Sequence, residues 1–117
     1  EDGLDEITVC DGTRISQFRG PDVETFYVTP ESFGIRPAQR DEILGGGKDL
    51  NAAITMAILK GEAGAKRDMV LINAAAALVV AGTAPDFQIG ITQAVDAIDS
   101  GLALAKLKQV RQLTSSL

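Results

Sequence analysis

The sequence predicts an α/β fold in which short strands with a β-hairpin are followed by a cluster of about four α-helices. In the first 28 residues, β-branched runs are separated by Gly, Pro and Asp, which is typical of strands and turns. From Arg40 onward, apolar residues recur about every 3.6 positions, which is typical of helices. The chain has 117 residues, of which 45% are hydrophobic and 4% aromatic, so one globular domain with an aliphatic core is expected.

Three short strands are expected, at residues 7–10, 13–18 and 23–28. The turn dipeptide Asp11-Gly12 separates the first two. The sequence Arg19-Gly20-Pro21-Asp22 predicts a hairpin between the last two, because Pro presets one turn dihedral and Gly tolerates the other.

Residues 29–33 are expected to form one helical turn. Thr29 provides a capping hydroxyl and Pro30 suits the first helical position, where its missing N–H costs nothing. Gly34 is expected to end the turn.

Four helices are expected, at about residues 50–60, 67–81, 87–98 and 102–113. Asp49 is the expected cap of the first, and Gly61 its end. The second is apolar nearly all round, so it is expected to be the most buried element. Thr83, Pro85 and Asp86 together mark the start of the third, and Ser100-Gly101 separates the third from the fourth.

Composition excludes several classes of function. The net charge is −5 and no basic stripe is present, which argues against binding to nucleic acid. The longest apolar stretch, residues 69–82, is shorter than a bilayer span of about 20 residues, so no membrane partner is expected. Cys10 is the only cysteine, which excludes an intramolecular disulfide and favours a cytoplasmic location.

The adjacent carboxylates of Asp5 and Glu6 are the sharpest chemical feature of the chain. Magnesium is commonly held by one or two carboxylates while substrate phosphates and waters complete its octahedron. A solvated acidic turn in front of a strand is the alternative, and it is the commoner meaning of an acidic pair considered alone.

Other polar features favour structural roles. The loop Gly45-Gly46-Gly47-Lys48 could cradle a phosphate at a helix start, but a structural turn is favoured because the loop lacks the established phosphate-binding patterns. Lys66 and Arg67 lie at a helix start, which is unfavourable for cations, and Asp68 is the simplest partner for them. A helix cap with a surface ion pair is favoured over a role in substrate binding.

Two further side chains are candidates for the interior. Asn73 is expected to bond a neighbouring backbone group rather than a ligand. Cys10 is expected to act as a small hydrophobic residue. The chain contains no His, so a Ser-His-Asp triad is excluded.

The order and spacing of several short motifs resemble anthranilate phosphoribosyltransferase from Gly3 to about Val110. The motifs are Gly3-Leu4-Asp5-Glu6, Thr29-Pro30-Glu31-Ser32-Phe33-Gly34, Gly45-Gly46, Asn51-Ala52-Ala53, Arg67-Asp68, Asn73 through Leu78, and Ala97-Ile98-Asp99-Ser100-Gly101. The resemblance implies transfer of the phosphoribosyl group of phosphoribosyl pyrophosphate to anthranilate, with release of pyrophosphate, in tryptophan synthesis. It also implies that Asp5 and Glu6 hold Mg²⁺ on the diphosphate.

The resemblance further implies that residues 1–117 are the carboxy-terminal portion of a larger phosphoribosyltransferase α/β domain. The family's phosphate-binding Gly-Thr-Gly-Gly-Asp motif does not occur in these residues, and the chain begins without Met. We therefore expect no catalytic residue here beyond the metal ligands Asp5 and Glu6, no activity of these residues alone, and a homodimeric parent. Substrate-binding residues are not assigned.

Two alternatives stay open at this point. The parent could be a related nucleoside phosphorylase, or the chain could be a non-enzymatic interaction module. If residues 7–10 belong to a larger sheet, the isolated chain exposes unpaired strand edges, and self-association is expected.

Overall fold

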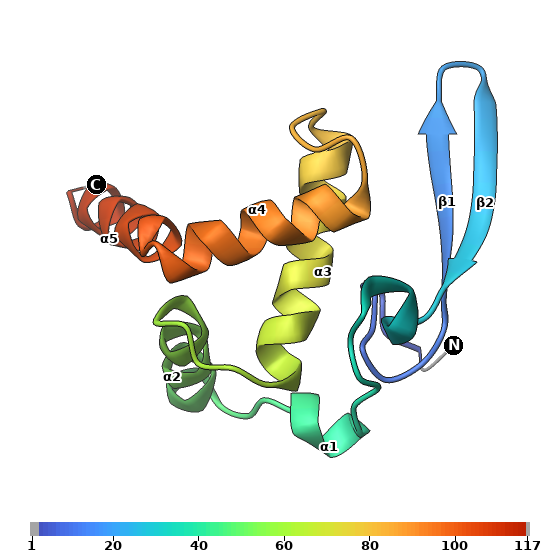
Figure 1. Ribbon diagram of the computed structural model, residues 1–117. Coiled ribbons are helices and arrows are strands. Elements are labelled where there is room, and N and C mark those ends of the chain that lie inside the picture. The colour runs from blue at the N-terminus through green and yellow to red at the C-terminus, as the bar shows by residue number, and fades with distance from the viewer. Residues whose placement is uncertain (1–2, 117) are drawn as a thin grey trace.

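The computed structural model describes residues 3–116, and residues 1, 2 and 117 lie outside the described part. Figure 1 shows a hairpin at one side of a long central helix, with the other helices crossing or flanking that helix. The elements, in chain order, are β1 (Thr13–Arg19), β2 (Asp22–Val28), the 3-10 turn η1 (Pro30–Phe33), α1 (Arg40–Ile43), α2 (Lys48–Leu59), α3 (Ala65–Val80), α4 (Phe87–Asp99) and α5 (Leu102–Ser115). The predicted order of a hairpin followed by a helical cluster is confirmed.

The hairpin has the predicted turn and an antiparallel register in which Phe18 faces Val23. The hydroxyls of Ser16 and Thr25 hydrogen-bond across its outer face at 3.0 Å. Its inner face places Ile15 against the core. Successive side chains of the hairpin therefore alternate between a solvent-exposed face and a face that packs on the core, as in any β-strand.

The strand expected at residues 7–10 is not formed in the described part of the chain. Its backbone bonds go elsewhere: the Thr8 N–H donates to Thr13 Oγ1 at 3.2 Å, and the Val9 carbonyl accepts from the Ala38 N–H at 2.9 Å. The segment is nonetheless buried, with Val9 fully so. A run of β-branched residues is typical of a buried extended segment, whether or not a neighbouring strand pairs with it. The prediction of a strand was wrong because the sequence pattern does not show whether such a pairing partner exists.

The helical turn predicted at residues 29–33 is present as η1. The Thr29 N–H donates to Ser32 Oγ at 3.0 Å, and Gly34 ends the turn with a φ of 72°. That left-handed backbone suits Gly, as expected. The one-turn helix α1 was not predicted separately.

The four longer helices match the periodic pattern; α2 and α3 start two residues earlier than expected, whereas α4 and α5 start where they were expected. Helix α2 begins at Lys48 after Gly47, so Asp49 lies in its first turn rather than at its cap. Helix α4 starts where the signature of Thr83, Pro85 and Asp86 predicted, and Asp86 is its cap, because Asp86 Oδ1 accepts from the Ile89 N–H at 2.8 Å. No helix in residues 3–116 is both long enough and apolar enough for a bilayer crossing.

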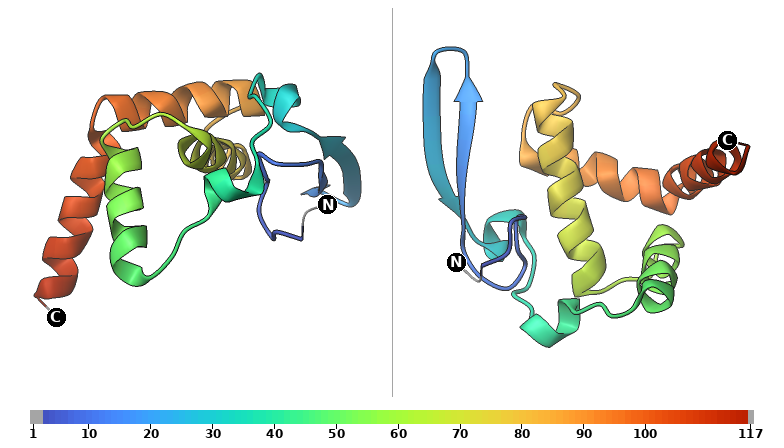
Figure 2. Two further views of the ribbon diagram at one scale, coloured as in Figure 1. Left: turned by 90° about the horizontal axis from the view of Figure 1, so that it is seen from below. Right: turned by 180° about the vertical axis from the view of Figure 1, so that it is seen from behind.

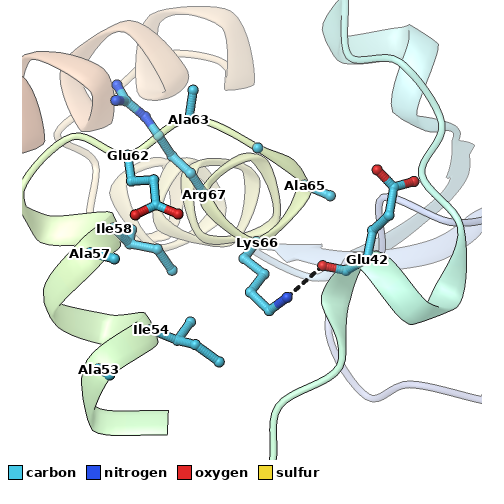
Figure 3. Close-up of a pocket in the computed structure, with 11 residues that line it drawn as sticks. Glu42, Ala53, Ile54, Ala57, Ile58, Glu62, Ala63, Ala65, Lys66 and Arg67 are labelled. Carbon is cyan, nitrogen blue, oxygen red and sulfur yellow. Dashed lines mark hydrogen bonds between the residues drawn. The ribbon is translucent and has the colours of Figure 1, made fainter. Parts of the chain in front are cut away.

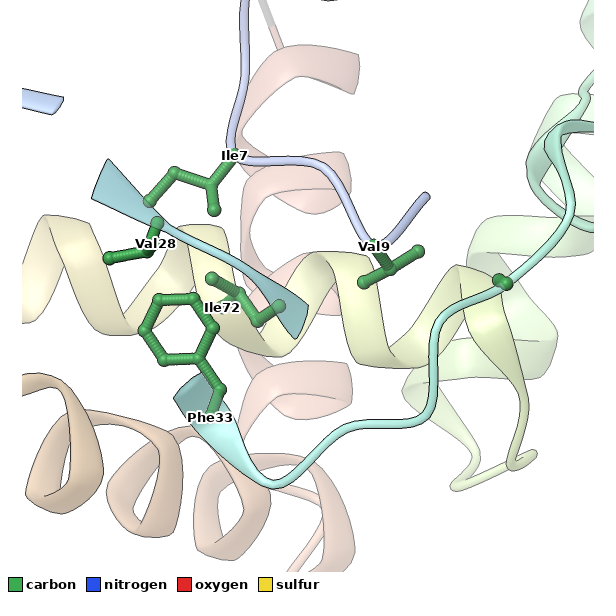
Figure 4. Packing of buried hydrophobic residues seen from close by; sticks show 6 residues of the cluster. Ile7, Val9, Val28, Phe33 and Ile72 are labelled. Carbon is green, nitrogen blue, oxygen red and sulfur yellow. The ribbon is translucent and has the colours of Figure 1, made fainter. Parts of the chain in front are cut away.

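Helix α3 joins two core clusters. The first surrounds Ile72 and is shown in Figure 4; its buried members are Ile7, Val9, Val28, Phe33, Ala38 and Ile72. The second consists of Ile58, Leu71, Ala94 and Ile98. Ile72 is 0% exposed whereas Val80 is 84% exposed. Three of the 16 residues of α3 are exposed, compared with five of the 13 residues of α4, which agrees with the expectation that α3 is the most buried element.

The arrangement is open, as the views in Figure 2 show, with the hairpin at one end and α5 at the other. The radius of gyration is 15.3 Å, compared with about 13 Å for a compact chain of similar length. Large apolar side chains are exposed on the hairpin, on α3 and on α5: they include Phe18, Val23, Tyr27, Val70, Val80, Leu102 and Leu113. The surface therefore offers apolar area that a second surface could cover.

Candidate functional site

Asp5 and Glu6 lie in a bend immediately before the buried segment that starts at Ile7. Both carboxylates are exposed, and both residues line one cavity of about 780 Å³. The cavity lies between the hairpin and α3, and its walls include Ile15 and Asn73. The structure places the acidic pair at the edge of this cavity, whereas the sequence analysis expected the pair next to a strand, and residues 7–10 form no strand.

The acidic pair lies at the surface because the two residues before Ile7 are charged, whereas residues 7–10 are mostly apolar. Ile7 and Val9 are buried in the first core cluster, whereas Asp5 and Glu6 stay in contact with solvent. Burial of an unpaired carboxylate costs several kcal/mol, so the acidic pair stays outside while the apolar run is drawn in. The result is two carboxylates at the rim of an otherwise largely apolar cavity.

Asn73 holds this segment from α3. Its Oδ1 accepts from the Ile7 N–H at 3.0 Å, and its Nδ2 donates to the Ile7 carbonyl at 2.8 Å and to the Met69 carbonyl at 2.9 Å. The prediction that Asn73 bonds backbone groups is confirmed. The pattern did not reveal which backbone it bonds, since Ile7 is 66 residues away in the chain.

The carboxylates of Asp5 and Glu6 suit a Mg²⁺ ion that is bound to a phosphorylated ligand. Among the described residues, no group of three or more Asp, Glu, His or Cys side chains gathers to hold a metal. Two exposed carboxylates provide hard oxygen ligands but leave most of an octahedron for waters and substrate phosphates. Asp5 and Glu6 therefore fit a metal that arrives with a phosphorylated ligand, and not a metal cage built by protein alone.

A second hollow of about 330 Å³ adjoins the first and shares Glu6 and Asn73 with it. The glycine loop lines this hollow through Gly45. Asn51 Oδ1 accepts from the Gly46 N–H at 2.8 Å, and Asn51 Nδ2 donates to the Gly46 carbonyl at 2.8 Å. Since Asn51 already engages this backbone, the structural-turn interpretation of the loop is supported and the phosphate-cradle interpretation is not.

The close packing of the glycine loop also explains its composition. A Cβ at Gly45 would clash with Asn51 Oδ1, and a Cβ at Gly46 would lie 2.8 Å from Leu50 Cδ2. A side chain at either position would displace the Asn51 or Leu50 side chain. Gly45 and Gly46 therefore serve close packing next to the start of α2, whereas a Cβ at Gly47 would meet no atom within 4 Å.

The cations at the start of α3 are already engaged within the protein. Figure 3 shows a third hollow, of about 500 Å³, in which Lys66 Nζ donates to the Glu42 carbonyl at 2.7 Å. Arg67 Nη1 donates to the Gly61 carbonyl at 2.8 Å, and Arg67 Nη2 pairs with Asp99 Oδ1 at 2.8 Å. The Arg67 side chain is only 12% exposed.

Asp68 is not the partner of Arg67, and the predicted surface pair is wrong. Burial raises the pKa of Asp68, and the positive charges of Arg67 and Arg36 offset part of this effect. Sequence reasoning missed Asp99. The sequence did contain a signal for this pair. A carboxylate at the carboxyl end of a helix, such as Asp99, and a cation at the amino end of a helix, such as Arg67, are both unfavourable in the field of the helix dipole. Each of these charges therefore needs an opposite charge nearby.

Cys10 is a partly buried free thiol that packs against the first core cluster. Its N–H donates to Thr8 Oγ1 at 3.0 Å. The expectation of a small hydrophobic packing residue is confirmed, although the residue does not belong to a strand.

Comparison with known proteins matches residues 1–104 to the model of the glycosyl transferase family, a/b domain. The chain is 46% identical over 113 residues to anthranilate phosphoribosyltransferase of Desulfatibacillum aliphaticivorans, which covers 97% of this chain and 33% of that protein. It is 25% identical to the Saccharomyces cerevisiae anthranilate phosphoribosyltransferase solved with PRPP and Mg (TM-score 0.81; 98% of this chain and 32% of that one). The same enzyme solved with 4-fluoroanthranilate gives a TM-score of 0.86 at 25% identity, over 98% of this chain and 34% of that one.

These matches confirm the resemblance inferred from the sequence motifs. The chain spans about a third of the length of the curated relatives that it matches.

Proposed function

This chain belongs to the glycosyl transferase family through its a/b domain, and on that premise we propose that it forms part of an anthranilate phosphoribosyltransferase. The proposed reaction transfers the phosphoribosyl group of phosphoribosyl pyrophosphate to anthranilate and releases pyrophosphate. One observation carries the proposal: Asp5 and Glu6 lie together at the rim of the cavity between the hairpin and α3. We propose residues 1–117 as the carboxy-terminal portion of the α/β domain.

The proposed role of Asp5 and Glu6 is to supply two oxygen ligands to Mg²⁺ on the diphosphate of the substrate. When bound, Mg²⁺ neutralises the negative charge that grows on the departing pyrophosphate. The two carboxylates are exposed, so they can exchange water for the metal without losing a partner inside the core. The proposal needs no covalent nucleophile among the described residues, and it makes the cytoplasm the expected location.

Replacement of Asp5 by Asn or of Glu6 by Gln in the full-length protein is expected to lower kcat/KM for anthranilate about 100-fold, a loss typical of removing one group that stabilises transition-state charge. The Mg²⁺ concentration needed for half-maximal activity is expected to rise in both variants, since each loses one charged ligand. The measurement is the rate of anthranilate consumption with phosphoribosyl pyrophosphate across a Mg²⁺ titration.

Glu24→Gln is the matched control, because Glu24 is an exposed carboxylate on β2 that does not line the cavity. It is expected to retain full activity. Wild-type activity and an unchanged Mg²⁺ requirement in both Asp5→Asn and Glu6→Gln would refute the metal assignment. A full-length protein that splits nucleosides with phosphate and leaves anthranilate untouched would refute the transfer reaction itself.

We further propose that the exposed apolar surface makes the isolated chain self-associate, and that the whole protein is a homodimer. The support is the two-stranded sheet of the described residues, whose strands each have an unpaired edge, together with the exposed Phe18 and Val80. Sedimentation of the isolated chain is expected to show a mass that rises with concentration. A monomeric profile over a hundredfold range of concentration would contradict this expectation.

A further inference from the structure

The Asn73 side chain makes more hydrogen bonds than it needs to satisfy its amide within its own helix. A half-buried amide inside a helix can satisfy its donor through the carbonyl four residues earlier, and the bond to the Met69 carbonyl does this. The two remaining bonds both reach Ile7, across 66 residues of sequence. Asn73 therefore connects α3 to the segment that carries the acidic pair.

The position of these bonds matters for the acidic pair. The Ile7 N–H belongs to the planar peptide unit that also contains the Glu6 Cα, and the Ile7 carbonyl belongs to the next unit. Asn73 thus holds two consecutive peptide planes, and the first of them sets where the Glu6 side chain departs. Apolar burial begins only at Ile7, whereas Asp5 and Glu6 are exposed.

We propose that Asn73 is a positioning residue for metal binding, acting through the backbone of Glu6 and Ile7 without touching the metal. This inference rests on the proposed function, in which Asp5 and Glu6 are the ligands. Asn73 and Glu6 line the same two cavities, so the Asn73 side chain is part of the walls of the proposed site. Groups that orient metal ligands typically change metal affinity 10- to 100-fold when they are removed.

The test measures Mn²⁺ binding to the full-length protein by electron paramagnetic resonance, with inorganic pyrophosphate present. Asn73→Ala removes all three bonds and is expected to weaken Mn²⁺ binding at least about tenfold. Asn73→Ser is the variant that guards against misfolding, because a Ser hydroxyl can still bond the Met69 carbonyl but cannot span to Ile7. It is expected to weaken Mn²⁺ binding to the same degree.

Leu71→Ala is the matched control for stability. Leu71 lies on the same helix but packs in the second core cluster with Ile58, Ala94 and Ile98. This variant is expected to lower the melting temperature at least as much as Asn73→Ala, while Mn²⁺ affinity stays within twofold of the wild type.

The outcomes separate this inference from the proposed function. If Asp5→Asn weakens Mn²⁺ binding but neither Asn73 variant does, the positioning role is refuted and the proposed function stands. If Leu71→Ala weakens Mn²⁺ binding as much as Asn73→Ala at an equal loss of melting temperature, Asn73 acts only through stability, and the inference is again refuted. If Asp5→Asn leaves Mn²⁺ binding unchanged, the metal assignment itself fails, and the inference fails with it.

Discussion

Replacement of Ile72 by Ala is expected to lower the free energy of unfolding by about 2–5 kcal/mol, the range measured for large-to-small changes in closed cores. Ile72 has no exposed surface, and it lies where Ile7, Val28 and Phe33 converge on α3. The lost methyl and methylene groups leave a cavity that segments from four parts of the chain would have to close. Urea unfolding followed by circular dichroism measures the change.

Val80→Ala provides the control on the same helix, since Val80 is almost fully exposed near the end of α3. Removing its methyl groups is expected to change the free energy of unfolding by less than about 0.5 kcal/mol. Equal losses for Ile72→Ala and Val80→Ala would show that the first core cluster does not hold the fold together.

Replacement of Gly90 by Val is expected to lower the free energy of unfolding by about 3 kcal/mol, near the upper end of the usual range for overpacking. Gly90 is buried where α4 crosses α3. A Cβ there would lie 2.9 Å from the Ala75 Cβ and 3.0 Å from both the Ala75 Cα and its carbonyl oxygen. Backbone atoms cannot rotate away, so the two helices would have to separate. Urea unfolding again measures the loss.

Ala77→Val controls for the cost of a β-branched residue within a helix. Ala77 lies on the exposed side of α3, so only helix propensity should matter, and the expected loss is below about 0.7 kcal/mol. A Gly90→Val protein as stable as the Ala77→Val protein would mean that the α3–α4 contact is looser than the distances indicate.

The site depends on the same packing. Ile72, the neighbour of Asn73 on α3, packs in the core cluster that contains Ile7, and Ile7 is the residue whose backbone Asn73 bonds. Loosening of Ile72 should therefore also loosen the bond from Asn73 to Ile7. A stability defect at Ile72 is expected to bring weaker metal binding with it, which is why Leu71 rather than Ile72 serves as the control for Asn73.

Local chemistry was readable from the sequence because it acts between near neighbours. The hairpin turn at residues 19–22 needs only Gly and Pro in their places. The cap of α4 needs only Asp86 three residues before an N–H. Asp5 and Glu6 could also be identified as candidate metal ligands, because the ability of a carboxylate to bind Mg²⁺ is a property of the residue type.

The α/β class, the hairpin, the four longer helices and the acidic pair could all be predicted from the residues alone. Three features could not: the absence of a strand at residues 7–10, the ion pair of Arg67 with Asp99, and the bonds of Asn73 to Ile7. The two groups differ in how far apart along the chain the interacting residues lie. Helical periodicity and helix capping act between residues a few positions apart. A paired strand, an ion pair or a side-chain bond to a distant backbone needs a partner that packing brings near. That partner lies 32 residues away for Arg67 (99 minus 67) and 66 residues away for Asn73.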